Sequence, residues 1–380
     1  MSDEIVNKVF ELYESLGKNG KPAANEWTCL AAFILEDASG GCGVVSMATG
    51  TKCVGGNAMV IDGTVVFDSH AEVLARRNFL RYLYGQLEVV KNGGGSAIVE
   101  LEDDKKFRII DGAKIHFYTS QLPCGDASIV PTNFESDQES IENDELPAKK
   151  AKFDVHRTGA KPVKSDPRQD PKGGGAEYHA RGAVRIKPGR GDPTKSLSCS
   201  DKIAKWIYCG LQGALLSLLI TEPIELSSII IGGAGPFDRQ VLESALVGRS
   251  GLNGSESSKR RIPTMARSPI VFKHSAEATG AKRPCAASIG WADVEEKKLE
   301  VSVEGRCLGA TKKSKKPRFL TTSKRSLFCL FSSVYGASKE SAYGTLKKSS
   351  AAYEARKKEF VQKMGSWSDD KTEFDNFKID

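Results

Sequence analysis

The feature that most constrains the fold of this chain is a long amphipathic segment, residues 69–87, that begins with a histidine and a glutamate two positions apart. Its apolar side chains recur every three or four positions, so the segment is predicted to be a helix with one broad buried face. Ser69 is the expected N-cap. A helix with one apolar face needs a second layer to cover it, and the neighbouring segments have the character of strands.

Strand-like and helix-like segments alternate along the rest of the chain, which predicts an α/β architecture. We expect one domain over residues 1–380, with a central mixed sheet, flanking helices and a helical carboxy-terminal part. The predicted strands are residues 27–35, 42–48, 114–118, 224–232, 270–272, 287–291 and 299–303. The other predicted helices are residues 3–16, 211–220, 238–247 and 338–364, and a further one that opens at Cys199.

Residues 133–195 differ in composition from the rest of the chain. They run from an acidic stretch (ESDQESIENDE) through a basic one (LPAKKAKFD) into segments rich in proline and glycine. Such sequences bury little apolar surface, so we expect a long, largely disordered insertion here. Lys149-Lys150-Ala151-Lys152 is either a nuclear localisation signal or a solvated basic run, and the sequence does not distinguish the two.

Composition narrows the class of protein. Hydrophobic residues make up 39% of the 380 residues, enough to bury a core, and the formal net charge of +7 suits a polyanionic partner without proving one. The amino terminus lacks the apolar core of a signal peptide, and no run of about eighteen apolar residues occurs. We therefore expect a protein of the nucleus or cytoplasm that is not secreted and has no membrane partner. Its nine widely spaced cysteines are then reduced thiols or metal ligands.

Four residues form the candidate constellation for chemistry. Imidazole is a common zinc ligand, and a nearby glutamate can move protons, but His70 and Glu72 alone carry little weight because such short patterns recur by chance. Cys124 follows a predicted strand directly after a proline, and Cys199 opens a helix. Three ligands, His70, Cys124 and Cys199, leave a fourth position for water, as in catalytic zinc sites. Ala127 stands where a closer second cysteine would be expected, so the last ligand comes from farther along.

Three motifs around these residues resemble the deaminase domain of adenosine deaminases acting on RNA. They are His70-Ala71-Glu72 followed by Val-Leu-Ala-Arg-Arg, then Leu122-Pro123-Cys124-Gly125-Asp126, and then Ser198-Cys199-Ser200-Asp201-Lys202-Ile203-Ala204-Lys205-Trp206. The resemblance covers nearly the whole chain except the insertion. It implies a cytidine-deaminase-like fold in which His70, Cys124 and Cys199 hold Zn²⁺. It also implies that Glu72 is the proton shuttle in the hydrolysis of adenosine to inosine.

Two further cues favour the members of this family that act on tRNA. One is the segment Arg185-Ile186-Lys187-Pro188-Gly189-Arg190-Gly191-Asp192, and the other is the absence of an attached double-stranded-RNA-binding domain. In addition, Ser128 stands where the RNA-editing members carry an arginine near the target. An unpaired loop adenosine costs less to extract than a paired one. The resemblance implies tRNA-Ala as the partner and the adenosine immediately 3′ of its anticodon as the target, and no obligate protein partner is inferred.

RNA contacts are expected at Gly50-Thr51-Lys52, which in the family lies beside the target nucleotide. Thr51 would contact the ribose and Lys52 a phosphate, and ordinary turn chemistry is the alternative for both. The basic run 312–318 either binds tRNA phosphates or is simply solvated. Two rival functions stay open, a deaminase of messenger or duplex RNA and a non-catalytic RNA-binding pseudo-deaminase. Glu72 argues against the second, because a dead relative has no need of a proton shuttle.

A second constellation falls on the predicted helix 338–364. If this helix is regular, Tyr343, Lys347, Tyr353 and Lys357 share one face with apolar side chains. Cations on such a face either reach solvent or meet a buried anion. Members of the family bury inositol hexakisphosphate in the domain core. The matching positions in this chain are Arg76, Arg77, Lys202, Lys205, Trp206, Lys324, Tyr343, Lys347, Tyr353, Lys357 and Trp367.

Overall fold

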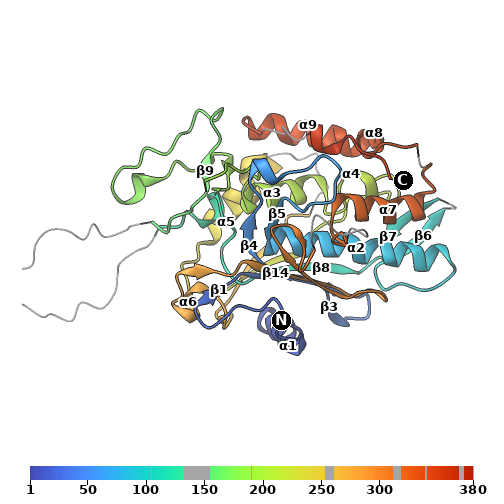
Figure 1. Ribbon diagram of the computed structural model, residues 1–380, viewed down its shortest axis with the longest axis horizontal. Coiled ribbons are helices and arrows are strands. Elements are labelled where there is room, and N and C mark those ends of the chain that lie inside the picture. The colour runs from blue at the N-terminus through green and yellow to red at the C-terminus, as the bar shows by residue number, and fades with distance from the viewer. Residues whose placement is uncertain are drawn as a thin grey trace, which may run out of the picture.

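The computed structural model describes residues 1–103, 105–131, 155–189, 191–252, 261–310, 318–338, 340–367 and 372–379. Within these residues the centre is a mixed sheet of eight strands in the order β12-β11-β8-β2-β3-β14-β15-β16 (Figure 1). Strands β8, β11 and β12 run parallel to one another, and the other neighbours pair antiparallel. The predicted α/β fold with a central mixed sheet is confirmed. The strands are β2 (Leu30–Glu36), β3 (Cys42–Thr49), β8 (Lys114–Thr119), β11 (Ser228–Gly232), β12 (Thr264–Ser268), β14 (Ala287–Ala292), β15 (Leu299–Val303) and β16 (Arg306–Cys307).

The two faces of this sheet bury different cores, because alternate side chains of a strand point in opposite directions. On one face, Phe33 of β2 stacks on Phe79 of α2 (Ala71–Lys91), with ring centroids 4.9 Å apart. On the other face, Ile34 belongs to a smaller core that α1 (Ser2–Ser15) covers. Figure 1 shows α1 below the sheet and α2 above it. Burial on both faces explains why β2 reads as a continuous apolar run.

Smaller elements surround this core. The short strands are β1 (Glu26–Trp27), β4 (Thr51–Cys53), β5 (Asp68–His70), β6 (Val99–Asp103), β7 (Lys106–Ile109), β9 (Lys161–Pro162), β10 (Arg185–Ile186) and β13 (Arg283–Pro284). The further helices are α3 (Cys199–Cys209), α4 (Gly213–Leu216), α5 (Arg239–Leu246), α6 (Ala276–Thr279), α7 (Lys324–Tyr335), α8 (Tyr343–Ser349) and α9 (Ala351–Met364). Single 3-10 turns are η1 (Gly56–Ala58), η2 (Asp126–Ser128), η3 (Gly175–Tyr178), η4 (Gly248–Ser250) and η6 (Thr372–Asp375). In the part of the chain that the structure describes, no helix has both the length and the apolar character needed to cross a bilayer.

The start of α2 lies two residues after the predicted start, and its N-cap differs from the predicted one. The helix begins at Ala71 with His70 as its N-cap, and no side chain caps it. Ser69 was the wrong choice because it lies in β5, paired with Lys52 of β4. Because β5 pairs with β4, His70 lies at the end of β5, and Glu72 lies in the first turn of α2.

Three other predicted elements also differ. Residues 338–364 are two helices, α8 and α9, because Ser350 has ψ +82°, outside the helical range. Only Gly213–Leu216 is helical within residues 211–220, and turns follow it. Residues 270–272 are not a strand. The edge strand of the sheet is β12, which pairs with β11. Phe272 instead packs against Tyr13, with ring centroids 5.0 Å apart.

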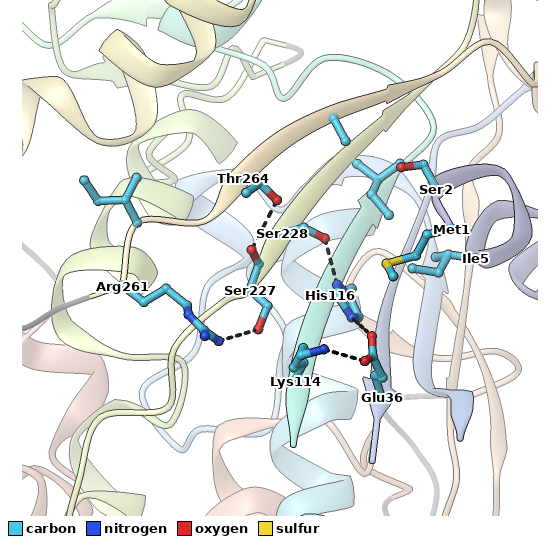
Figure 2. Close-up of a pocket in the computed structure, with 13 residues that line it drawn as sticks. Met1, Ser2, Ile5, Glu36, Lys114, His116, Ser227, Ser228, Arg261 and Thr264 are labelled. Atoms are coloured by element: carbon cyan, nitrogen blue, oxygen red, sulfur yellow. Dashed lines mark hydrogen bonds and ion pairs between the residues drawn. The ribbon is translucent and has the colours of Figure 1, made fainter. Parts of the chain in front are cut away.

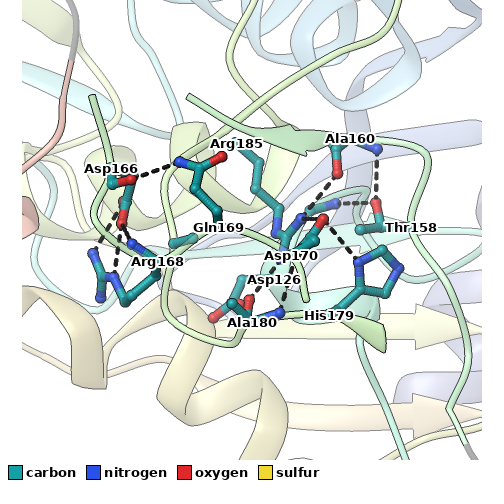
Figure 3. Close-up of polar contacts among 12 residues, drawn as sticks. Asp126, Thr158, Ala160, Asp166, Arg168, Gln169, Asp170, His179, Ala180 and Arg185 are labelled. Atoms are coloured by element: carbon teal, nitrogen blue, oxygen red, sulfur yellow. Dashed lines mark hydrogen bonds and ion pairs between the residues drawn. The ribbon is translucent and has the colours of Figure 1, made fainter. Parts of the chain in front are cut away.

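The second part of the predicted insertion is folded. Residues 155–189 and 191–195, called the 155–195 lobe below, contain β9 and β10, whereas residues 132–154, including Lys149–Lys152, lie outside the described residues. Figure 3 shows how Arg185 joins the lobe together. Its fully buried guanidinium donates to Asp170 at 2.7 and 2.9 Å and to the carbonyl oxygens of Ala160 and Ala180. Buried ionic contacts, which composition does not reveal, join buried apolar side chains such as Val163 and Val184 here, so the expectation of disorder is wrong for this part.

Candidate active site

The structure brings His70, Cys124 and Cys199 together beyond the carboxyl end of β8. His70 ends β5, Cys124 lies between β8 and η2, and Cys199 is the first residue of α3. The Sγ atoms of Cys124 and Cys199 lie 4.0 and 3.7 Å from His70 Nδ1. All three ligand atoms lie within 4.8 Å of one another. Segments far apart in the sequence thus meet with their metal-binding atoms facing one point.

This donor set fits a tetrahedral zinc ion. With bond lengths of about 2.3 Å to sulfur and about 2.0 Å to nitrogen, tetrahedral geometry separates a sulfur from a nitrogen ligand by roughly 3.5 Å. The observed separations of 3.7 and 4.0 Å need only a small contraction. Two thiols and one imidazole leave a fourth position open to water or substrate, as in catalytic sites.

The loop that carries Cys124 is fixed by its neighbours. Gly125 has φ +107°, a conformation that side chains disfavour, and a Cβ there would lie 2.3 Å from Ser198 Oγ. Ser198 is the N-cap of α3 and accepts a hydrogen bond from the Asp201 N–H at 3.1 Å. The Cys199 N–H in turn donates to Cys124 Sγ at 3.4 Å. An N–H at a helix start that points at sulfur favours the thiolate, which is the form that binds metal.

A buried lysine adds positive charge to this thiol pair. Lys187 Nζ lies 3.1 Å from Cys199 Sγ and 2.8 Å from Asp68 Oδ2. Burial opposes the charge of Lys187, but Asp68 and Cys199 outweigh it and raise its pKa well above the ordinary range. The hydrogen bond with Cys199, followed by the charge of Lys187, holds the pKa of Cys124 well below its usual range. This lowered pKa favours the thiolate of Cys124, the form that binds metal.

Asp68 connects the cluster to its surroundings. Its carboxylate accepts hydrogen bonds from the His70 N–H at 3.0 Å, from Cys53 Sγ at 3.3 Å and from Lys202 Nζ. The sequence reasoning assigned no site role to Asp68 or Lys187. The available signals were the position of Asp68, two residues before His70, and the place of Lys187 within the segment 185–192.

Glu72 holds its carboxylate inside the same site. The residue is 4% exposed, and its Oε2 has no hydrogen-bond partner among the described residues. A buried carboxylate oxygen is costly to leave unsatisfied, so this atom is poised for a water or substrate proton. A carboxylate beside an open metal position is suited to proton transfer.

A cavity of about 830 Å³ opens onto these residues, and His70, Glu72 and Cys124 line it. Thr51 and Lys52 line it as well, because β4 pairs with β5 in a register that sets Thr51 opposite His70. Thr51 Oγ1 is buried without a partner in the described part of the chain. The volume is within the range of small-molecule sites, about 300–1,000 Å³, and suits a nucleotide.

Asp68 also lines a second cavity, of about 240 Å³, where most of the expected anion-binding side chains meet. Those that line it are Arg76, Arg77, Lys202, Lys205, Trp206, Lys324, Tyr353 and Trp367. Tyr343, Lys347 and Lys357 are not among the lining residues, although Lys357 lies on the same helix, α9, as Tyr353. Lys347 instead pairs with Asp375 at 2.6 Å, and the same carboxylate also pairs with Lys324.

The second cavity gathers buried cations. Arg76 and Arg77 donate hydrogen bonds to the backbone carbonyl oxygens of Leu211 and Thr322. Burial lowers the pKa of Arg77 to about 10, a sign of a cation that lacks its full compensation. Trp367 Nε1 is buried with no partner among the described residues. Crowded buried cations and an unpaired donor fit a multiply charged anion.

The basic run 312–318, a predicted RNA contact, lies mostly outside the described residues. Of this run, only Arg318 belongs to the residues that the structure describes.

Known proteins resemble this chain over most of its length. Residues 46–371 match the adenosine-deaminase (editase) domain. The chain is 33% identical over 423 residues to human tRNA-specific adenosine deaminase 1, covering 82% of this chain and 84% of that protein. It is 35% identical over 343 residues to the Drosophila melanogaster protein of the same name, with 86% and 80% covered. To mouse double-stranded RNA-specific adenosine deaminase it is 28% identical over 408 residues, covering 99% of this chain and 32% of that protein. The chain therefore belongs to the adenosine-deaminase (editase) domain family and is an adenosine deaminase.

Proposed function

We propose that this chain hydrolyses adenosine to inosine in tRNA, using Zn²⁺ held by His70, Cys124 and Cys199. The observation that carries the proposal is Glu72, a buried carboxylate with an unsatisfied oxygen in the cavity that His70 and Cys124 also line. Relatives named tRNA-specific adenosine deaminase 1 resemble this chain over 82% and 86% of its length. Their name supports tRNA as the substrate.

In this mechanism, zinc would activate a water molecule as a nucleophile at neutral pH. Glu72 takes a proton from that water as its oxygen attacks C6 of the adenine ring, and delivers the proton to the ring. Glu72 then takes the remaining proton from the hydroxyl added at C6 and delivers it to the departing amine as the C6–N bond breaks. Water and adenosine become inosine and ammonia, so protons and oxygen balance, and Glu72 ends in its starting state.

The proposed target is the adenosine immediately 3′ of the anticodon of tRNA-Ala. Thr51 would hold the ribose through its unsatisfied Oγ1, and Lys52 a neighbouring phosphate. The cavity must receive a base that has left its stack, and an unpaired loop nucleotide leaves at low cost. A tRNA substrate agrees with the expected nuclear or cytoplasmic location and needs no obligate protein partner.

We also propose that inositol hexakisphosphate occupies the second cavity and bridges the cations around it. Arg76, Arg77 and Lys202 would bind it from one side, and Trp367 would donate through its unpaired Nε1. The expected contacts also include Lys205, Trp206, Lys324, Tyr343, Lys347, Tyr353 and Lys357. Mass spectrometry of the extract from denatured protein checks this. Folded protein that releases no inositol phosphate would remove the proposal.

The decisive experiment incubates the protein with total tRNA and sequences the product, since inosine is read as guanosine. Glu72→Ala serves as the control that keeps the fold. Inosine confined to tRNA-Ala supports the proposed target. Inosine only in long duplex RNA would favour an RNA-editing deaminase instead. A zinc-loaded wild-type protein that produces none in either RNA would indicate a non-catalytic RNA-binding relative.

A further inference from the structure

The 3-10 turn η1, directly after β4, cannot cap its own start. Its N-cap is Gly55, which has no side chain and makes no capping hydrogen bond. The first N–H groups of a helical turn need acceptors from elsewhere. The Asn57 N–H donates to Asp192 Oδ2 at 2.8 Å, and the Gly56 N–H donates to the Pro193 carbonyl oxygen at 2.9 Å. A carboxylate 135 positions away in the sequence thus supplies the missing cap.

Glycines on both sides make this contact possible. A Cβ at Gly55 would lie 2.3 Å from Asp192 Oδ2, and one at Gly189 would lie 1.8 Å from the Asp192 carbonyl oxygen. A Cβ at Gly55 would thus displace the Asp192 carboxylate, while Gly189 permits the tight turn that carries Asp192 within the opposite segment. The close approach and the cap therefore depend on each other.

Both joined segments belong to the wall of the substrate cavity. Val54, Gly55 and Ala58 line it from one side, and Pro188, Gly189 and Asp192 line it from the other. Residues Thr51 and Lys52, in the strand just before η1, line the same cavity. Movement of η1 would consequently move the strand that carries the proposed nucleotide contacts.

We infer that Asp192 is a positioning residue for the substrate: by capping η1 across the cavity mouth, it fixes β4 and the opposite segment at the separation that the target nucleotide needs. Asp192 does this through a backbone contact, without touching the reacting atoms. Loss of a capping side chain costs about 1 kcal/mol, which corresponds to about a fivefold change in an equilibrium. The segments that lose this contact form a cavity wall, so the loss should weaken mainly the binding of substrate.

The test compares Asp192→Ala with Asp192→Asn and with Asp238→Ala. Asparagine keeps an oxygen that accepts the Asn57 N–H, so Asp192→Asn should have a KM for tRNA near the wild-type value. Asp238 is the matched control, because it also caps a helix, accepting the Val241 N–H at 3.1 Å, but does not line the cavity. For Asp192→Ala we expect KM for tRNA to rise about fivefold, with kcat and zinc content nearly unchanged. Asp238→Ala should lower thermal stability and leave KM at the wild-type value.

Hydrogen exchange and a second variant separate this inference from the proposed function on which its KM assay rests. In Asp192→Ala the amides of residues 56 and 57 should exchange faster than in the wild type, a result that needs no substrate. Gly55→Ala should have the same effect, since its Cβ would push the Asp192 carboxylate away. Wild-type protein that fails to deaminate tRNA would overturn the substrate proposal alone. Unchanged exchange at these amides, or equal KM in wild type and Asp192→Ala, would overturn the role of Asp192.

Discussion

Two histidine clusters stand at opposite ends of the same strand, β8, and they differ in how well their polar atoms are satisfied. Near its amino end, His116 bonds to Ser228 Oγ through Nδ1 at 2.8 Å and to Glu36 Oε2 through Nε2 at 3.1 Å (Figure 2). Lys114 donates to the other oxygen of Glu36 at 2.6 Å. Beyond the carboxyl end of β8 lies the cluster of His70, where atoms of Glu72 and Thr51 lack partners among the described residues.

This difference supports the proposal that the His70 cluster is catalytic and the His116 cluster structural. Serine, histidine and carboxylate beside a cavity of about 330 Å³ resemble a hydrolytic triad by residue type. However, Glu36 is already paired with Lys114, and both ring nitrogens of His116 have a partner within the protein. The His70 cluster instead leaves a buried carboxylate oxygen unsatisfied, a cost that persists where a ligand offsets it. In open α/β sheets, ligands bind beyond the carboxyl ends of the parallel strands, which is where this cluster lies.

The largest expected effect comes from removing the unsatisfied carboxylate. Glu72→Gln keeps the shape of the side chain but cannot carry the proton, so single-turnover deamination should slow by about a thousandfold while zinc content stays at the wild-type level. His116→Gln, the control at the other end of β8, should keep activity within about twofold. Comparable losses in both variants would show that the contrast between the clusters is wrong.

Metal content should distinguish the cysteines of the site from the others. Cys199→Ser removes a proposed ligand, and its zinc affinity should fall by more than about a hundredfold, measured by competition with a chelator. Cys42→Ser is the matched control, since Cys42 lies on β3 and belongs to no potential ligand group among the described residues. Full zinc retention in Cys199→Ser would remove this residue from the ligand set.

Replacing a buried cation tests the second cavity through the sign of the change. If an anion is bound there, Arg77→Met leaves it with one partner fewer, and the free energy of unfolding should fall by about 3 kcal/mol. If no anion is bound, relief of the crowded charges should make the variant more stable than the wild type. Arg108→Met, which breaks a surface pair with Glu100, should leave the free energy of unfolding nearly unchanged. Denaturant titration of both variants decides between the signs.

The sequence was sufficient wherever a pattern is local. Helix α1 and strands β3 and β8 follow from periodicity, and α3 begins at Cys199 as predicted. The candidate ligands and the candidate proton shuttle could be proposed from the sequence because histidine, cysteine and glutamate carry distinct chemistry. The break at Ser350 has no such signal, since serine is common within helices.

Contacts between distant segments account for what could not be predicted. Lys187 meets Asp68 across 119 positions, so neither residue reveals its role locally. The folding of the 155–195 lobe depends on the pairing of Arg185 with Asp170, while the local composition favours disorder. Polar pairs of this kind have no periodicity, and only the tertiary structure identifies their partners.

The smallest expected effect concerns the pH dependence of stability and comes from the satisfied cluster. Burial lowers the pKa of His116 below its ordinary value of 6.5, and the contact with Glu36 offsets this only in part. Below pH 6.5 the unfolded chain therefore binds a proton that the folded chain resists, so the contribution of His116 to stability is lost as the pH falls from 6.5 towards its folded pKa.

His116→Gln removes that titration, and its free energy of unfolding should depend less on pH over this range than that of the wild type. The difference between the two curves isolates His116 from His179 and His274, whose pKa values burial also lowers. Parallel curves would mean that His116 titrates alike in the folded and unfolded chains. A steeper curve for the variant would mean that the imidazole is charged in the folded state, and that this cluster is less fully satisfied than its hydrogen bonds indicate.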